Sequence, residues 1–442
     1  MSAGLKLRQD IETLIKEYEL ELKKPVGSRK ITGFQRFFLA LKAIQELPIM
    51  DHNSFFWLAS YHGSSSSEVY AEQRRLARVS LSGPQFCAHG IPEFPAWHRV
   101  YISKFEKALQ SIDAEVTLPY WNQFSETSKT SGFHNMLSTA QLELADGSFI
   151  SNPLSGYTLQ ATVGRYSQGT RTFRNNSRLA KYIATQHASV VKRALEVKDY
   201  DTFSNHSNKD SLEGPHDNIH GYTGGFMGNP TIAAFDPIFW LHHCFIDFLF
   251  WVWQIKFGQL QALTSDFLFN KLIPFEKTKN VFYSIADTAK IEDFNYIYPE
   301  FDLGIVGIES KQGRKLFSSL RSAPLVSKEE GSKRELTIAG IDFARLGGTV
   351  IINAYAFPPD GKRFLGTYTV FRSSDDCENC VVRSTVDAVF RMKNVRTEHE
   401  GNLEFKIKFE QMNNGGFSFR FKMLPGVRYV KNILGNTFEV SY

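Results

Sequence analysis

The sequence has few cysteines, little net charge and no long apolar run. Four cysteines among 442 residues exclude a small scaffold held together by disulfides. The 51 basic and 46 acidic residues are mixed along the chain and leave a net charge of +5, so we expect neither a nucleic-acid nor a membrane partner. No stretch reaches the roughly 20 apolar residues of a membrane-spanning helix. The aromatic run at residues 245–253 is interrupted by Asp247 and predicts a buried helix.

The first ten residues lack an apolar segment after Lys6 and Arg8. A secretory signal needs such a segment, so we expect the protein to be cytoplasmic.

Aromatic residues are abundant. The 38 Phe, 17 Tyr and 6 Trp residues make up 14% of the chain, which predicts cores built from rings and favours a site for ring-shaped ligands. The chain is also too long for one hydrophobic core of ordinary size, so we expect two domains.

Hydrophobic periodicity divides the chain. Helical spacing predicts two helices within residues 5–47 and others at 99–112 and 178–197. Later in the chain, alternating β-rich segments occur at 349–356, 364–371, 386–392, 403–409 and 417–423.

Residues 311–333 between these regions are rich in Lys, Arg, Ser and Gly and predict an exposed linker. We therefore predict a mainly α domain at 1–303, a linker at 304–334 and an all-β sandwich or barrel at 335–442.

Histidines concentrate in the helical half of the chain. His216 and His220 are four residues apart, so on a helix both imidazoles can reach one metal ion. His243, on the second turn of a helix that starts near Pro237, supplies a third ligand.

A second set of three consists of His62, His89 and His98, so the sequence predicts two metal ions. Neutral imidazoles without carboxylates suit copper or zinc rather than magnesium or calcium. We expect the carbonyl-rich turns around Gly63, Gly90 and Gly221 to orient the rings.

The segments around these histidines resemble the two copper signatures of type 3 copper proteins, which comprise tyrosinases, catechol oxidases and molluscan haemocyanins. The first signature runs from His89 to Arg99 and continues to Glu106, and the second covers residues 236–247. The chain also has residues that resemble further family elements: Leu118-Pro119-Tyr120-Trp121-Asn122, Arg8 and Tyr296-Ile297-Tyr298. The resemblance implies a four-helix bundle around a dicopper site, followed by a β-rich shielding domain as in fungal tyrosinase precursors.

The resemblance also implies roles for individual residues. It makes His62, His89 and His98 the ligands of the first copper ion and His216, His220 and His243 those of the second, and leaves His242 outside the set.

Cys87 matches the family cysteine that forms a thioether with a ligand, here His89. Glu213 resembles an acidic residue that orients a water, and Asp217 and Gly221 frame the substrate entrance, which Gly221 leaves open. Phe94 and Phe239 precede ligands by four residues, so we expect their rings beside the imidazoles at this entrance.

The implied activity is oxidation of small phenols by O2 at two copper ions, with hydroxylation of monophenols, oxidation of ortho-diphenols, or both. A haemocyanin-like oxygen carrier is the alternative, because it would share all six ligands. The chain departs from the family at Phe248, where Arg is frequent, and at Gln123, where Trp is usual. The sequence leaves the oligomeric state open.

The resemblance further implies latency, in which the β domain inserts a bulky side chain into the entrance. Phe364, Tyr368 and Phe371 are the candidates for this plug. Cys377 and Cys380 resemble a cysteine pair that helps to deliver copper in fungal precursors, so we expect their double replacement by Ser to slow copper uptake.

Overall fold

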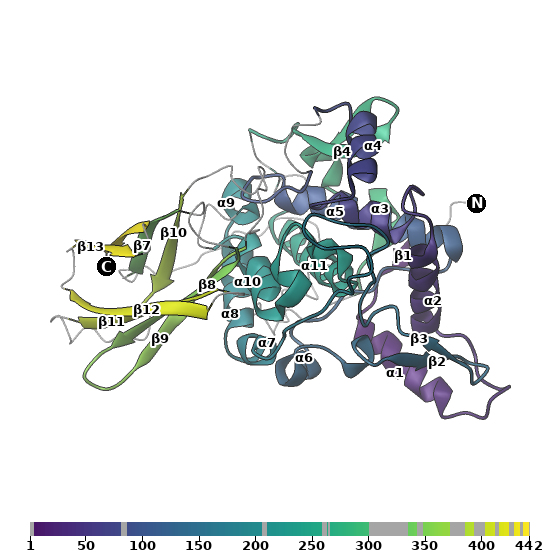
Figure 1. The fold of residues 1–442 in the computed structure, drawn as a ribbon, viewed down its shortest axis with the longest axis horizontal. Helices are drawn as coiled ribbons and strands as arrows, with labels where there is room; N and C mark the ends of the chain where they lie inside the picture. The colour runs from purple at the N-terminus through teal and green to yellow at the C-terminus, as the bar shows by residue number, and fades with distance from the viewer. Residues whose placement is uncertain are drawn as a thin grey trace.

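The computed structural model describes residues 4–80, 86–205, 210–258, 263, 266–299, 335–342, 348–371, 385–392, 403–411, 415–423, 428–433 and 436–441. The chain is mainly helical up to residue 299 and forms β-strands from residue 335, and the two parts lie side by side in Figure 1. This confirms the predicted fold class. The predicted linker at 304–334 lies outside the described residues, so the domain boundaries stay predictions.

The helical part contains long helices and short turns. Its α-helices are α1 (Ile11–Leu22), α2 (Gly33–Glu46), α3 (Phe55–Ser60), α4 (Ser67–Ala77), α5 (Phe94–Ile112), α6 (Glu126–Ser131), α7 (Leu179–Tyr182), α8 (Ala188–Glu196), α9 (Tyr200–Ser204), α10 (Glu213–Thr223) and α11 (Ile238–Phe257). Its other helical turns are the 3-10 turns η1 (Asn135–Leu137), η3 (Gly225–Gly228), η4 (Ala233–Phe235), η6 (Ile285–Thr288) and η7 (Ile291–Phe294) and the π turn η2 (Ile183–His187). Its strands are β1 (Lys6–Leu7), β2 (Gln141–Glu143), β3 (Phe149–Ser151), β4 (Lys271–Thr278), β5 (Val281–Ser284) and β6 (Tyr296–Ile297).

Local sequence explains where the main helices start. The Thr32 side chain accepts a hydrogen bond from the Gln35 backbone at the start of α2, and Pro95 lies in the first turn of α5. Helix α5 therefore begins at Phe94 rather than at residue 99. Helix α11 is long and apolar enough to cross a membrane by composition, but 94% of its most apolar window is buried inside the fold. The predicted buried helix is confirmed.

The two ends of the helical part meet in a buried ion network. Strand β1 pairs in parallel with β6 and brings Arg8 to Glu106 on α5, with a 2.7 Å ion pair, and to Asp247 on α11, at 3.2 Å. Asp247 also accepts hydrogen bonds from the hydroxyls of Tyr296, at 2.5 Å, and Tyr298, at 2.7 Å. All five side chains are buried, so each charge depends on its partners.

The β part is a sandwich of two four-stranded antiparallel sheets with a core of its own. One sheet has the order β10-β7-β14-β13 and the other the order β12-β11-β8-β9. Their strands are β7 (Glu335–Asp342), β8 (Val350–Phe357), β9 (Arg363–Val370), β10 (Thr385–Arg391), β11 (Leu403–Gln411), β12 (Gly415–Met423), β13 (Arg428–Ile433) and β14 (Asn436–Ser441).

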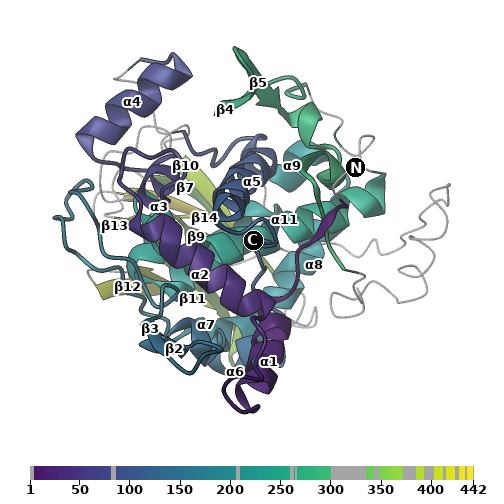
Figure 2. The same ribbon diagram turned by 90° about the vertical axis from the view of Figure 1, so that its right-hand side faces the viewer.

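Strand β8 joins the two parts because it is buried on both faces. Ile352 and its alternate neighbours point into the sandwich core, whereas Ile351 packs into the core of the helical part. In Figure 2 helices α1 and α2 face the viewer and the strands of the sandwich lie behind the helical part. Helix α10 contacts β8 and β9, so the sandwich covers the face on which α10 lies.

Candidate metal centre

Six histidines converge from five segments of the helical part. His62 follows α3, His89 precedes α5 and His98 lies on α5, while the other three lie on α10 and α11. Five of the six are fully buried and His89 is half-buried. The sites predicted from the sequence, His62, His89, His98, His216, His220 and His243, therefore lie together.

The two sets of three adjoin each other. In one set the Nε2 atom of His243 is 3.3 Å from the Nε2 atoms of both His216 and His220. In the other, the ring centres of His62, His89 and His98 are 5.2 to 5.7 Å apart. The rings of His98 and His243 stack at 4.4 Å and connect the two sets. This arrangement can hold two metal ions as neighbours.

Backbone carbonyls fix the orientation of three of the rings. The Nδ1 atoms of His62, His98 and His220 lie 2.8 to 2.9 Å from the carbonyl oxygens of Pro230, Phe94 and Met227, respectively. These acceptors keep the hydrogen on Nδ1 and leave the Nε2 lone pair free. None of the three carbonyls belongs to the turns around Gly63, Gly90 and Gly221 that the sequence favoured, because the acceptors come from the loop before α11 and from α5 itself.

The residues fit copper ions. Within the described part of the chain, the Nε2 atoms of His62 and His98 are buried and have no hydrogen-bond partner, which is costly unless a ligand is bound there. Burial lowers the pKa of His62 to about 4 and those of His98, His216, His220 and His243 well below the usual value. The imidazoles are therefore neutral at physiological pH, the form that binds a metal.

Two buried carboxylates support the ligands from outside. The carboxylate of Glu213 accepts a hydrogen bond from the Gly90 backbone N–H, at 2.8 Å, and so holds the loop next to His89. Asp217 Oδ1 lies 2.8 Å from His216 Nδ1. It acts as the acceptor for this ring, as the backbone carbonyls do for His62, His98 and His220. Burial and the nearby Glu213 raise the pKa of Asp217, and a cation bound at His216 would favour the ionised carboxylate. Through these contacts Glu213 and Asp217 position the ligands, in addition to the roles that the resemblance implies for them.

Phe94 and Phe239 are fully buried and pack against the imidazoles. The Phe239 ring is 4.0 Å from His243, and the Phe94 ring is 4.8 Å from both His98 and His216. The rings lie beside the imidazoles as predicted, but inside the core rather than at an exposed entrance.

The entrance at Gly221 is covered by the sandwich. A Cβ atom at Gly221 would lie 2.9 Å from Cγ2 of Thr369 on β9, so the two backbones approach closely. Phe371, just beyond β9, stacks on His220 at 4.2 Å and 22° and contacts His89 and His216 edge-on. The absence of a side chain at Gly221 thus lets β9 pack closely against α10. The predicted entrance is closed in this arrangement.

Of the three plug candidates, the structure brings Phe371 to the histidines. Tyr368 is buried in the sandwich core, and the ring of Phe364 packs on Tyr355 at 5.1 Å, away from the site. Phe364 and Tyr368 differ in surroundings because the pairing of β8 with β9 shifts register between Ala354 and Tyr355, which disrupts the alternation of side chains. Phe371 follows the strand, and its ring lies against His220 on α10.

Cys87 lies beside two histidines of the first set, His62 and His89. Cys87 is buried, carries a free thiol whose pKa burial raises to about 12, and offers its sulfur within 4.8 Å of ligand atoms of His62 and His89. The thioether stays a prediction. Cys377 and Cys380 lie outside the described residues.

His242, which the resemblance leaves outside the ligand set as a neighbour of the ligands, lies next to the second set of three. One of its ring nitrogens is within 4.8 Å of ligand nitrogens of His216, His220 and His243, and its Nδ1 atom is 2.8 Å from Nε2 of Gln123.

Comparisons with known proteins agree with this geometry. The family model for the common central domain of tyrosinase matches residues 52–256. Tyrosinase HcTyr2 of Hahella sp. (strain CCB-MM4) is 28% identical, over 96% of this chain and 94% of its own length. Hemocyanin 1 of Megathura crenulata is 25% identical, over 76% of this chain and 9% of its own length.

Solved structures are similar over nearly the whole chain, sandwich included. A tyrosinase from Burkholderia thailandensis has a TM-score of 0.71 and 24% identity, with 92% of this chain and 94% of that chain covered. A structure of latent and active mushroom tyrosinase has a TM-score of 0.62 and 18% identity, with 96% of each chain covered. At these identities the likeness shows a shared fold.

Proposed function

We propose that this chain, which belongs to the tyrosinase family of type 3 copper proteins, is a phenol oxidase that uses O2 at two copper ions and is latent while its sandwich is docked. The observation that carries this proposal is the ring of Phe371 stacked on His220 among six convergent imidazoles.

The imidazoles divide between the two ions as the family signatures imply. His62, His89 and His98 would hold one copper ion, and His216, His220 and His243 the other. Bound copper supplies the electrons that reduce O2 and the oxidising power that converts phenols to quinones. Buried neutral nitrogens without partners support this assignment.

The protein itself would orient the phenol and exclude water. Phe371 occupies a position in which an aromatic ring contacts His220, His216 and His89 at once. A free phenol stacked there would meet the same three imidazoles, with its hydroxyl toward the metal ligands. The fully buried rings of Phe94 and Phe239 hold the imidazoles from the other side.

Latency follows from competition for this position. The Phe371 ring is attached to a docked sandwich, so its effective concentration at the site is high and it displaces free substrate. The docking surface includes the Tyr222 hydroxyl, 3.1 Å from Oγ1 of Thr367, and an ion pair between Arg178 and Glu410. Displacing or removing the sandwich would open the site.

A haemocyanin-like carrier is the second candidate, because such a protein would need the same imidazoles. A relative that matches 96% of this chain and 94% of its own length is named a tyrosinase, whereas Hemocyanin 1 is matched over 9% of its own length. This difference favours the oxidase.

The test is an assay of O2 uptake and quinone formation with tyrosine and with its ortho-diphenol. Copper-loaded protein would be assayed intact and after brief trypsin treatment. We expect low activity before cleavage and high activity after it. Reversible O2 binding without quinone formation after cleavage would establish the carrier instead, and activity with the diphenol alone would restrict the function to a catechol oxidase.

A further inference from the structure

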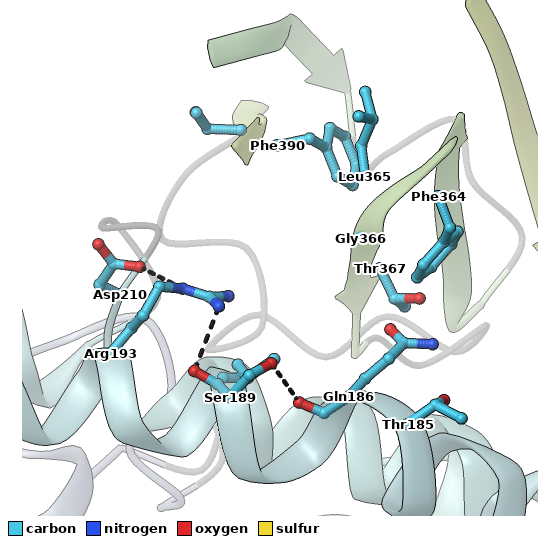
Figure 3. Close-up of a pocket in the computed structure, with 12 residues that line it drawn as sticks. Thr185, Gln186, Ser189, Arg193, Asp210, Phe364, Leu365, Gly366, Thr367 and Phe390 are labelled. Carbon is cyan, nitrogen blue, oxygen red and sulfur yellow. Dashed lines mark hydrogen bonds and ion pairs between the residues drawn. The ribbon is translucent and has the colours of Figure 1, made fainter. Parts of the chain in front are cut away.

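A pocket at the junction of the two parts has no role in the proposed phenol oxidation. It has a volume of about 220 Å³, and none of the six ligand histidines lines it. Residues of η2 and α8 form one wall, and residues of β9 and β10 form the other (Figure 3). Because each part supplies one wall, the pocket is complete only while the sandwich is docked. Its volume is below the roughly 300–1,000 Å³ of pockets for drug-sized ligands, so it suits a single small metabolite.

Two backbone irregularities face each other across this junction pocket. On β9, the register against β8 shifts between Ala354 and Tyr355, which leaves Leu365 as an extra residue in the strand. The next residue, Gly366, has a φ angle of 154°, which residues with a side chain rarely adopt. On the other wall lies the π turn η2. Bulges and π turns are both frequent at functional sites, so their opposition indicates a binding site rather than a packing gap.

Opposite charges lie next to each other on the helical side of the pocket. The Nε atom of Arg193 is 3.1 Å from Oδ1 of Asp210, and its Nη1 atom donates to the Ser189 carbonyl oxygen at 3.2 Å. In the described part of the chain its Nη2 atom has no hydrogen-bond partner. Figure 3 shows the guanidinium extending from α8 toward the strands. A carboxylate can accept about four hydrogen bonds, so Asp210 can accept from a further cation while it stays paired with Arg193.

This ion pair determines which charges a ligand can carry. A lone carboxylate bound at Arg193 would lie near the negative charge of Asp210, and a lone amine bound at Asp210 would lie near the positive charge of Arg193. A ligand that carries both groups on one carbon atom offsets both repulsions and gains two charge-assisted hydrogen bonds. A free α-amino acid has this arrangement at physiological pH.

The sandwich wall is largely apolar and favours an aromatic ring. It includes Phe364 and Leu365 of β9 and Val389 and Phe390 of β10. Phe364 is 36% exposed, so part of its ring is free to contact a ligand. Aromatic rings gain energy from stacked or edge-on contact with another ring. Contact with a ligand ring would give Phe364 a function, although it does not plug the metal centre.

We propose that the junction pocket binds a free aromatic α-amino acid. Arg193 holds its carboxylate, Asp210 holds its ammonium group, and Phe364 and Phe390 contact its ring. Since this ligand contacts both parts, it binds the docked arrangement and stabilises it by mass action. An aromatic amino acid therefore keeps the latent chain closed. The binding is independent of the copper ions, whereas its effect on activity rests on the proposed latency.

The probe is L-phenylalanine, which has no phenolic hydroxyl to be oxidised. Isothermal titration calorimetry would measure its binding to the full-length chain with and without copper. We expect a dissociation constant of about 1 mM or lower in both forms, because no ligand histidine lines the pocket. Hydrocinnamate lacks the amine and phenethylamine lacks the carboxylate, so each should bind about 10-fold more weakly or worse. Equal affinities for all three compounds would overturn the assigned ligand class.

Three variants locate the bound amino acid. Arg193→Gln should weaken binding about 10-fold or more by loss of a charge-assisted hydrogen bond, and Phe364→Ala about 2- to 10-fold by loss of a ring contact. Lys192→Gln is the matched control, because it removes a charge of α8 that pairs with Glu196 and does not line the pocket. It should bind phenylalanine as the wild type does.

Phe364→Ala decides the question if Arg193→Gln fails to fold. No binding by the wild-type chain would overturn the inference while leaving the proposed function intact. Wild-type affinity in the folded Arg193→Gln or Phe364→Ala variant would overturn it as well, because the amino acid would then bind elsewhere.

Phenol oxidation tests the regulatory effect. At about ten times its dissociation constant, phenylalanine should favour the docked state about 10-fold and lower the residual activity of the intact, copper-loaded chain by a similar factor. Arg193→Gln and trypsin-cleaved protein should show a much smaller fall. An equal fall after cleavage would place phenylalanine at the copper centre and overturn the regulatory effect. A chain that binds phenylalanine but oxidises no phenol, before or after cleavage, would overturn the proposed function and not the amino-acid site.

Discussion

Asp217 and Gly221, four residues apart on α10, set two different properties of the site. Asp217 holds the tautomer of His216, and Gly221 determines how closely the sandwich approaches. Neither residue needs to touch a substrate to change the activity. Each effect can be measured by comparing a variant with a matched control.

Asp217→Ala should weaken binding of one of the two copper ions about 10- to 100-fold, because His216 loses the acceptor that fixes its ring. Asp217→Asn keeps an acceptor oxygen and should lose much less. Competition titrations with a copper chelator measure both affinities. Equal affinities in wild type and Asp217→Ala would show that the ring is held without this contact.

Gly221→Ala should raise the activity of the intact, copper-loaded chain. The added methyl group would lie 2.9 Å from Thr369, and overpacking of this kind costs about 1–3 kcal/mol, which shifts the equilibrium toward the undocked state by roughly 5- to 160-fold. Gly214→Ala on the same helix is the control, because its nearest neighbour would be 3.9 Å away. No difference between the two variants would mean that the sandwich does not control access here.

The sequence predicted which histidines lie together but not which backbone groups orient their rings. The spacing of His216 and His220 is by itself enough to indicate a shared metal ion. The carbonyls of Pro230 and Met227 have no signature, because every residue carries a carbonyl group and only the folded chain decides which one meets a ring.

Strand β9 positions the plug residue, Phe371, which directly follows it. Its residues alternate between the sandwich core, where Tyr368 lies, and the surface that faces α10, where Thr367 and Thr369 lie. Phe371 extends beyond the last residue of this strand, so a small movement of β9 would withdraw its ring from His220.

Phe371→Ala should therefore raise phenol oxidation by the intact chain roughly 10-fold, through loss of one aromatic stacking contact and reopening of the site. Phe364→Ala is the matched control, because Phe364 lies on β9 but packs on Tyr355. Steady-state rates of copper-loaded protein test the pair. A rise with Phe364→Ala and none with Phe371→Ala would reverse the assignment of the plug.

Strong hydrophobic periodicity was enough to predict the positions of helices and strands, and weak periodicity was not. The predicted helices near 5–47 and the five predicted strands are present, each within a few residues of its predicted position. Residues 178–197 form α7, η2 and α8 rather than one helix, since the π turn leaves the apolar pattern almost unchanged. Strands β7, β13 and β14 were missed. The partners of β7, which are β10 and β14, are distant in sequence, whereas β13 and β14 pair with each other as a hairpin.

At the scale of the molecule, the β-sandwich closes the metal centre in the helical part of the same chain. Trypsin treatment of the intact protein should raise activity many-fold at constant copper content, because cleavage within 304–334 converts a tethered plug into one that can dissociate. Copper analysis and rate measurements on the same samples check this. A fall in activity would indicate that the sandwich mainly stabilises the helical part.

Arg8→Ala should unfold the helical part at lower denaturant concentration. Removal of the guanidinium leaves Glu106 and Asp247 buried with less compensation, a loss of about 3–5 kcal/mol in the free energy of unfolding. Lys24→Ala, which breaks an exposed ion pair with Glu21, should change little. Similar unfolding midpoints for both variants would contradict the role given to the buried network.

The pairing of β1 with β6 has a consequence for the order of the two parts in the chain. Lys6 lies opposite Tyr296 and Leu7 opposite Ile297, so the helical part begins and ends at one place on its surface. A circular permutation that connected the sandwich ahead of residue 4, instead of after residue 299, would start its tether from nearly the same point. Self-inhibition should therefore survive such a rearrangement, because it depends on where the tether leaves the helical part and on its length, and not on which part is synthesised first.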